Sequence, residues 1–152
     1  MKYILARYRK VYEGKTWYGK NISESLHLIK PEQRLRRVAD SYNIVELVLH
    51  MIAWRKYVLT IVDKRIHREV PDAENFPTIV EYSDEQWLAS IAVLARSQSD
   101  LISTLEGAEL ELQAESPKAG YSWSDIFEGL IHHDIYHIGQ INLIRKYADA
   151  TA

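Results

Sequence analysis

The chain has 152 residues, of which 47% are hydrophobic and 26% are charged, and its formal net charge is -2. This length and composition predict a single globular domain over residues 1–152, and the near-neutral charge gives no reason to expect nucleic acid as a partner. The sequence has no cysteine, which excludes disulfides, thiolate metal ligands and a cysteine nucleophile.

The first third of the chain predicts one long helix followed by short ones. Glycine (6) and proline (4) are scarce, which favours helices. The first predicted helix covers residues 2–13 and ends at Gly14. In the connection that follows we expect two short helices, one over residues 23–29 with Ser23 as its candidate N-cap and one over 31–39 that begins at a proline.

Capping signals mark the second long helix. Asn43 is followed three residues later by Glu46, the spacing of a capping box, and the run to about residue 66 contains neither glycine nor proline. Two prolines then punctuate residues 69–82, which predicts a loop between this helix and the next.

Two further capping pairs predict the remaining long helices. Ser83 and Gln86 open a helix to about residue 106, and Ser122 and Asp125 open one to about residue 147. No convincing strand appears between them. We therefore expect an all-α fold, a four-helix bundle with short extra helices in its first connection.

Three histidines are expected to face the interior of this bundle. His133 and His137 are four residues apart, so they lie one above the other on one face of the last helix. At about 100° per residue both fall in the same apolar stripe as Leu130, whereas His132 falls on the opposite face. The same geometry turns His50 toward the apolar side of the second long helix.

Two interpretations of these histidines stay open from spacing alone. Each imidazole is a hydrogen-bonded core residue, or the three together hold one metal ion. A buried imidazole has to satisfy both ring nitrogens or incur a cost of roughly 1–3 kcal/mol. A metal ion would satisfy three of those nitrogens at once, which favours a shared site.

The histidine segments carry a family resemblance. Residues 129–141 (GLIHHDIYHIGQI) resemble the last-helix motif of the DinB/YfiT-like superfamily of metalloenzymes, and residues 43–54 (NIVELVLHMIAW) resemble its second-helix motif. Residues 14–19 (GKTWYG) are similar to a connection in one branch, and residues 84–87 (DEQW) fit the start of the third helix. The resemblance covers nearly the whole chain in the expected order.

This resemblance implies a four-helix bundle that holds a divalent metal ion, often zinc or nickel, on three histidines. The matching positions are His50, His133 and His137. Members with assigned activities include S-transferases and isomerases that use low-molecular-weight thiols. The function that the resemblance implies is a metal-dependent S-transferase that activates an external thiol, and the lack of cysteine is compatible with this function but does not select it.

Alternatives remain beside this leading function: a metal-dependent hydrolase, or a non-catalytic metal-binding bundle. Three protein ligands leave a coordination position open, as catalytic zinc sites do.

The expected partner is a small-molecule substrate, and no membrane is expected. The N-terminal apolar run is too short for a signal peptide, and no apolar run is long enough to span a bilayer. We therefore expect a cytoplasmic protein.

Other polar residues have competing roles. Gln140 and Asp134 are the candidate catalytic residues, Gln140 as a contact to the site and Asp134 as an acceptor for a ligand imidazole. The alternatives are a structural amide for Gln140 and a surface cap or ion pair for Asp134. Glu46 lies one turn before His50, and the capping box is favoured over metal ligation for it.

Two surface expectations complete the prediction. Four aromatic residues are candidates for the mouth of a pocket or for the core: Trp17, Tyr18, Trp54 and Tyr57. A symmetric homodimer is expected through an exposed apolar face of the last helix, formed by Ile131, Ile135, Ile138 and Asn142.

Overall fold

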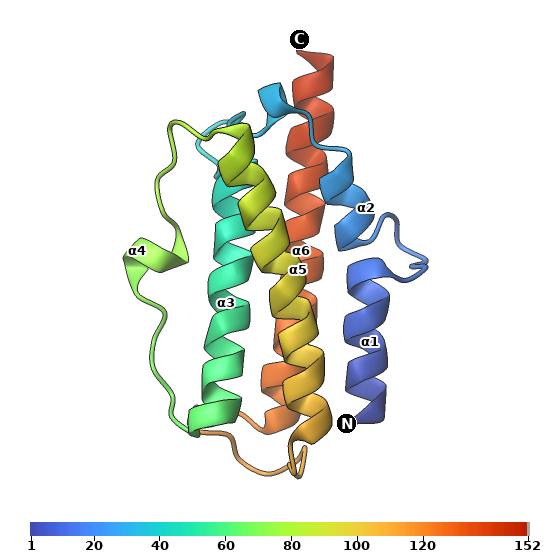
Figure 1. Ribbon diagram of the computed structural model, residues 1–152, viewed down its shortest axis with the longest axis vertical. Coiled ribbons are helices and arrows are strands. Elements are labelled where there is room, and N and C mark those ends of the chain that lie inside the picture. The colour runs from blue at the N-terminus through green and yellow to red at the C-terminus, as the bar shows by residue number, and fades with distance from the viewer. Residues whose placement is uncertain (152) are drawn as a thin grey trace.

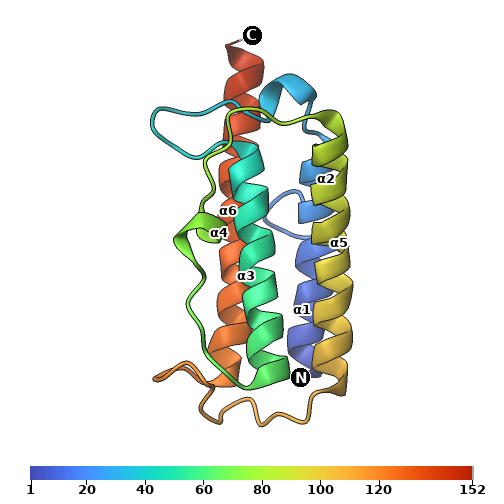
Figure 2. The same ribbon diagram turned by 60° about the vertical axis from the view of Figure 1, so that its left-hand side comes forward.

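The computed structural model describes residues 1–151, and within this range all the secondary-structure elements are helices. The four longest are α1 (Lys2–Glu13), α3 (Ile44–Lys64), α5 (Asp84–Gly107) and α6 (Trp123–Ala150). They run side by side, and α1 and α3 each contact both α5 and α6 (Figures 1 and 2). The predicted all-α class is confirmed. None of these helices combines the length and the apolar character needed to cross a membrane.

Three shorter elements fill the connections. Helix α2 (Ile22–His27) lies against α1 and α6, and the 3-10 turn η1 (Pro31–Gln33) contacts α6. Helix α4 (Asp72–Asn75) lies beside α3, away from α1 (Figure 1). The sequence predicted only a loop where α4 forms, and this single turn holds residues of the candidate site.

The predicted capping boxes are present. The Asn43 side chain accepts a hydrogen bond from the Glu46 N–H, and Glu46 Oε2 accepts one from the Asn43 N–H, both at 3.0 Å. Equivalent pairs begin α5 and α6. Gly14 ends α1 as predicted, and a Cβ there would approach the Lys10 Cα to 2.7 Å, so this close backbone approach requires glycine.

Two expectations in the first connection are wrong. The N-cap of α2 is Asn21, whose side-chain oxygen accepts from the Glu24 N–H at 2.8 Å, and Ser23 lies inside the helix. The helix expected over residues 31–39 ends after Gln33. Ala39 has a φ of 50°, a left-handed conformation that a right-handed helix cannot contain.

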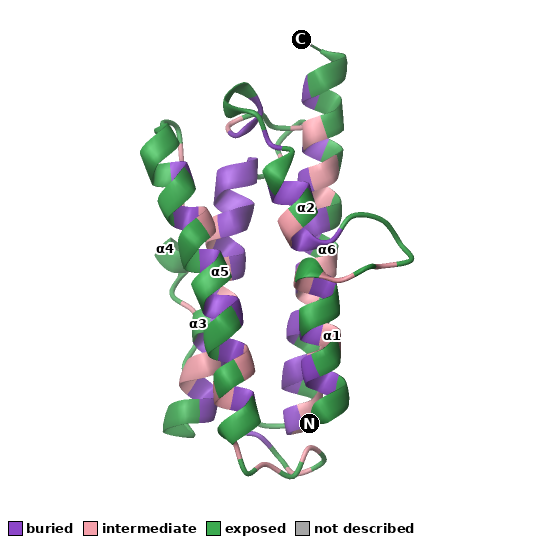
Figure 3. Ribbon diagram, turned by 45° about the vertical axis from the view of Figure 1, so that its right-hand side comes forward, coloured by how far each residue is buried: buried purple, intermediate pink, exposed green. Residues whose placement is uncertain are grey.

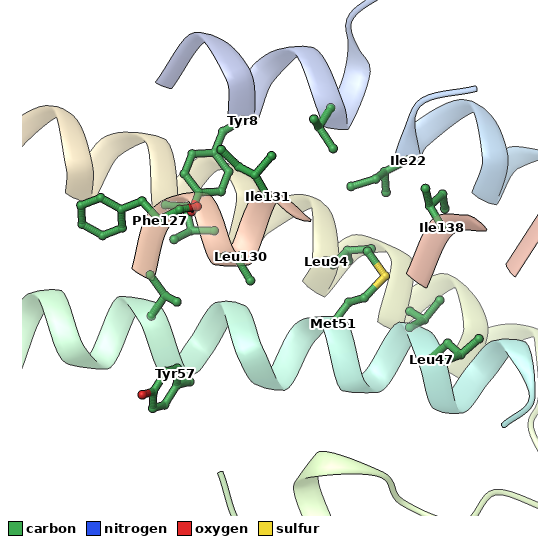
Figure 4. Close-up of a cluster of buried hydrophobic side chains, with 14 of the residues drawn as sticks. Tyr8, Ile22, Leu47, Met51, Tyr57, Leu94, Phe127, Leu130, Ile131 and Ile138 are labelled. Atoms are coloured by element: carbon green, nitrogen blue, oxygen red, sulfur yellow. The ribbon is translucent and has the colours of Figure 1, made fainter. Parts of the chain in front are cut away.

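The core lies where the long helices face one another, and their buried residues turn inward (Figure 3). Helix α3 contacts α4, α5 and α6, and its first half is buried nearly all round. Figure 4 labels ten of the core side chains, contributed by α1, α2, α3, α5 and α6: Tyr8, Ile22, Leu47, Met51, Tyr57, Leu94, Phe127, Leu130, Ile131 and Ile138. This burial makes α3 the central helix of the site described below.

The α6 face expected to form a dimer is partly covered by the chain itself. Ile131 and Ile138 are buried, and in Figure 4 they lie beside Tyr8 of α1 and Ile22 of α2. Asn142 Nδ2 donates to Ser25 Oγ of α2 at 2.9 Å. Two of the four predicted residues are therefore buried by α1 and α2, whereas Ile135 and Asn142 are half-buried, and the homodimer stays a prediction.

A buried ion pair joins α3 to α6. Arg55 Nη2 lies 2.6 Å from Asp134 Oδ2, and each side chain is only 1% exposed. Arg55 Nη1 also donates to Gln98 Oε1 of α5 at 2.7 Å, and the guanidinium lies 5.5 Å from the centre of the Tyr12 ring. All four long helices therefore meet at this one buried cation.

Replacing Arg55 with Met should lower the free energy of unfolding by about 3–5 kcal/mol, because Asp134 would remain as an unpaired buried charge. The double variant Arg55→Met/Asp134→Leu should recover much of that loss. Urea unfolding at pH 7.5 measures both. The matched control is Lys56→Met, which removes an exposed ion pair with Glu74 and should cost less than about 1 kcal/mol. Equal costs for the two single variants would contradict the electrostatic role of the buried pair.

Candidate metal centre

The three predicted histidines meet between α3 and α6. His133 Nε2 lies 2.8 Å from His50 Nε2 and 3.2 Å from His137 Nε2. One ring nitrogen from each of the three lies within 4.8 Å of the others. His50 and His137 are buried and His133 is half-buried. The convergence expected from helical geometry is thus present.

Hydrogen bonds set the tautomers of two of these rings. His50 Nδ1 lies 2.6 Å from the backbone oxygen of Asn75, and His137 Nδ1 lies 2.6 Å from Gln140 Oε1. Both oxygens can only accept, so each Nδ1 carries the proton. The Nε2 atoms of the two neutral rings are therefore bare lone pairs that point toward the same small space.

The third ring has an unpaired nitrogen beside an unpaired oxygen. Within residues 1–151, the buried His133 Nδ1 and Asp134 Oδ1 have no hydrogen-bond partner, and they lie 3.8 Å apart. A proton on His133 Nδ1 would face this carboxylate and leave Nε2 bare. A proton on Nε2 could reach only one of the two neighbouring Nε2 atoms. The first tautomer gives three converging lone pairs, the arrangement that a cation satisfies.

The spacing of these nitrogens fits a divalent ion. Zinc–imidazole bonds of about 2.0–2.1 Å in a tetrahedral site separate neighbouring nitrogens by about 3.3 Å. Two of the three separations, 2.8 and 3.2 Å, are close to that value, and the three ring nitrogens all lie within 4.8 Å of one another. Imidazole is a ligand of intermediate softness that suits zinc and nickel. His50, His133 and His137 are the residues that could hold such an ion.

Burial keeps two of the rings neutral. It lowers the pKa of His50 to about 4, against the hydrogen bond to Asn75, which raises it. It also lowers the pKa of His137 to about 4, and the neighbouring His133 adds to this lowering. Both rings are therefore in the neutral form that binds metal over the physiological pH range.

The segment around α4 covers the cluster. The Phe76 ring stacks on the His50 ring with centroids 3.9 Å apart. The Tyr42 ring stacks on the Phe76 ring, with centroids 3.8 Å apart. Trp54 Nε1 donates to Asn75 Oδ1 at 3.0 Å. Asn75 and Phe76 were missed by sequence reasoning, since neither residue has a spacing signal and their backbone position depends on how the loop folds back on α3.

The polar candidates have defined contacts. Gln140 accepts from His137, so its amide orients a ring of the cluster. Asp134 is paired with Arg55 in the interior, so the surface cap or surface ion pair considered for it is wrong. Glu46 Oε1 accepts from the Ile79 N–H at 2.8 Å and from Arg37 at 2.5 Å, and it holds the α4 connection at the start of α3. The structure leaves Glu46 outside the histidine cluster.

The four aromatic candidates separate into two groups. Trp54 and Tyr57 line a cavity that also reaches His133. Trp17 is 91% exposed, and Tyr18 lines a different groove beside Ile135, so neither belongs to that cavity. Within residues 1–151 the cluster does not include His27, His67 or His132.

Comparisons with known proteins identify no relative. No protein-family model matches the chain, no curated protein is similar to it, and no solved structure matches it.

Replacing His50, His133 or His137 with Ala should lower metal affinity by more than about 100-fold, since losing even an outer-shell partner of a ligand costs 10–100-fold. Elemental analysis of protein purified without chelator or affinity tag measures occupancy. His132→Ala is the matched control, because this ring lies on the opposite face of α6 and contacts Arg7. Near-full occupancy in the His137→Ala protein would contradict the three-histidine site.

The metal-free protein should lose stability as pH falls from about 6.5 to about 4. In the unfolded chain a histidine binds a proton below about 6.5, whereas native His50 and His137 stay neutral until about 4. The unfolded state then binds more protons, so the stabilisation from these rings is complete above pH 6.5 and declines below it. Thermal midpoints in chelator at pH 7.5, 6.5 and 5 measure the effect.

The double variant His50→Gln/His137→Gln should show a smaller loss between pH 6.5 and pH 5, and His27→Gln should behave as the wild type. His27 is exposed and bonds only to Ser23 in its own helix. If the double variant and the wild type lost the same stability over this range, the pKa values of the two buried rings would not be lowered.

Proposed function

We propose that this chain is a metal-dependent S-transferase of the DinB/YfiT-like superfamily, folded as a four-helix bundle, that activates a low-molecular-weight thiol. The observation that carries the proposal is the convergence of three histidine Nε2 atoms from α3 and α6. The order of the sequence motifs and the all-helical fold support the same assignment.

A divalent ion held by His50, His133 and His137 would leave room for an external ligand and would lower the pKa of a thiol or water bound to it. The chain has no cysteine, so a thiol nucleophile has to come from solution. Transfer then forms a bond between the thiolate sulfur and an electrophilic carbon. The leaving group departs with its bonding electron pair, and the proton of the thiol passes to solvent.

The chain's own residues prepare this site in two ways. Asn75 and Gln140 accept the Nδ1 protons of His50 and His137, which keeps both Nε2 atoms free and fixes the ring planes. Phe76 covers one face of His50 and excludes water from it. Gln140 is therefore a positioning residue in this proposal, because it acts through His137.

Thiol transfer to 1-chloro-2,4-dinitrobenzene should require both metal and thiol, tested with a panel of small thiols on zinc-loaded, nickel-loaded and chelated protein. The apparent pKa of the rate should lie below the free thiol's value of about 8.5. His137→Ala should abolish transfer, and His132→Ala should retain it. Gln140→Ala should reduce the rate by a smaller factor of about 10–100, together with a loss of metal affinity.

Three results would overturn the transferase proposal. One is a chelated protein that transfers thiol as fast as the metal-loaded protein. Another is a loaded protein that is inert to every thiol but hydrolyses p-nitrophenyl acetate, which would favour the metal-dependent hydrolase. The third is a loaded protein inert in both assays, which would leave a non-catalytic metal-binding bundle.

A further inference from the structure

A cavity of about 190 Å³ lies beside His133, between the first turns of α6 and the second half of α3. Its walls are mainly apolar and aromatic, and they include Trp54, Tyr57, Val58, Ile126 and Leu130. Tyr57 extends from α3 away from the other labelled core side chains in Figure 4. The exposed residues Tyr121 and Asp125 also line the cavity, which places its opening toward the connection before α6.

His133 is the member of the cluster that this cavity reaches. Its side chain is 20% exposed, whereas His50 and His137 are 4% and 5% exposed as whole residues. The Trp54 ring lies 5.5 Å from the His133 ring, so one wall of the cavity continues to the edge of the histidine cluster. A molecule in the cavity would therefore meet the cluster at His133.

The polar groups of the lining are largely engaged already. The Tyr57 hydroxyl lies 2.8 Å from His67 Nδ1, and the Asp125 carboxylate accepts from Ser122. The Lys118 ammonium lies 4.6 Å from the centre of the Tyr121 ring. The remaining polar groups belong to Lys118 and Tyr121 in the connection before α6 and to Asp125 in its first turn, while the other walls are mainly apolar and aromatic, so the cavity favours an apolar occupant. The volume is of the order of the ~150 Å³ cavity that accepts benzene in other proteins.

Gly129 keeps the floor of this cavity open. It lies inside α6, four residues before His133 and on the same face. Glycine weakens a helix interior relative to alanine, yet its backbone here is helical and a Cβ would meet nothing within 4 Å. Neither packing nor backbone conformation requires glycine. Helical side chains lean toward the N-terminus, so the His133 ring leans over the space that a side chain at 129 would enter.

We propose that this cavity receives a compact apolar group of the substrate, about the size of one aromatic ring or a branched alkyl group, and that Gly129 preserves the space for it. The inference rests on the proposed function, because it supplies the substrate class for the same site. The electrophile that reacts at the histidine cluster is accordingly a small hydrophobic molecule.

Benzyl alcohol is the probe, titrated into metal-free and zinc-loaded protein and followed by NMR of the Trp54 indole and the α6 amides. Saturable chemical-shift changes at Trp54 and around Gly129 are expected in both the metal-free and the zinc-loaded protein, because protein side chains form the walls of the cavity. Gly129→Leu should weaken binding roughly tenfold or more, because the leucine occupies the space of the ring. Gly129→Ala should have a smaller effect.

Gly139→Leu is the matched control. Gly139 is also inside α6, its Cβ would also meet nothing within 4 Å, and it lines the separate groove beside Tyr18. This variant should bind the probe within about twofold of the wild type. Thermal unfolding checks that both leucine variants fold.

The inference is overturned if benzyl alcohol produces no saturable shifts, if its shifts lie elsewhere, or if Gly129→Leu binds it as the wild type does. Binding to the metal-free protein needs neither metal nor thiol, so a failure of thiol transfer does not affect this result. Conversely, transfer that proceeds while the cavity rejects the probe would overturn the cavity proposal alone.

Discussion

The arrangement of the site depends on one constraint, that three imidazoles meet in a space too small for three separate sets of hydrogen-bond partners. Two of the rings donate their Nδ1 protons outward, to Asn75 and Gln140, so their Nε2 lone pairs have to face inward. Burial opposes protonation of these rings, as the pKa values of about 4 for His50 and His137 indicate. A shared cation satisfies all three lone pairs without placing a proton on a buried ring, which makes it the better physical solution near pH 7.

The charged residues next to the histidine cluster belong to a buried ion pair between Arg55 and Asp134. Arg55 neutralises Asp134 through one carboxylate oxygen and leaves the other 3.8 Å from His133 Nδ1. Because Arg55 also contacts Gln98 and Tyr12, the position of this carboxylate depends on all four long helices. The fold and the third histidine are thereby linked: a shift of any long helix would move the carboxylate oxygen that lies 3.8 Å from His133 Nδ1.

Local sequence signals predicted the long helices and the histidine cluster but not the residues that complete it. Asn43 with Glu46 and the four-residue spacing of His133 and His137 act within one helix, so they can be read without tertiary structure. Arg55 lies about 140° from His50 around α3 and would be placed outside, yet it is buried because α3 has neighbours on several sides. Asn75 reaches His50 only after the loop folds back. Ile131 was expected on the surface because no local signal places α1 and α2 over it.

The same carboxylate that begins α3 also holds the outer cover of the site. Glu46 uses Oε2 to cap the helix and Oε1 to accept from the Ile79 N–H, while Asn43 Nδ2 donates to the Ile79 oxygen at 3.0 Å. These contacts fix the chain three residues after Phe76, and the Trp54–Asn75 hydrogen bond fixes it on the other side. The cover over His50 is thus anchored at both ends to α3, the helix that carries His50. The cavity lined by Trp54 and Tyr57 borders His133, whose side chain is 20% exposed, so the two sides of the cluster differ in how they are enclosed.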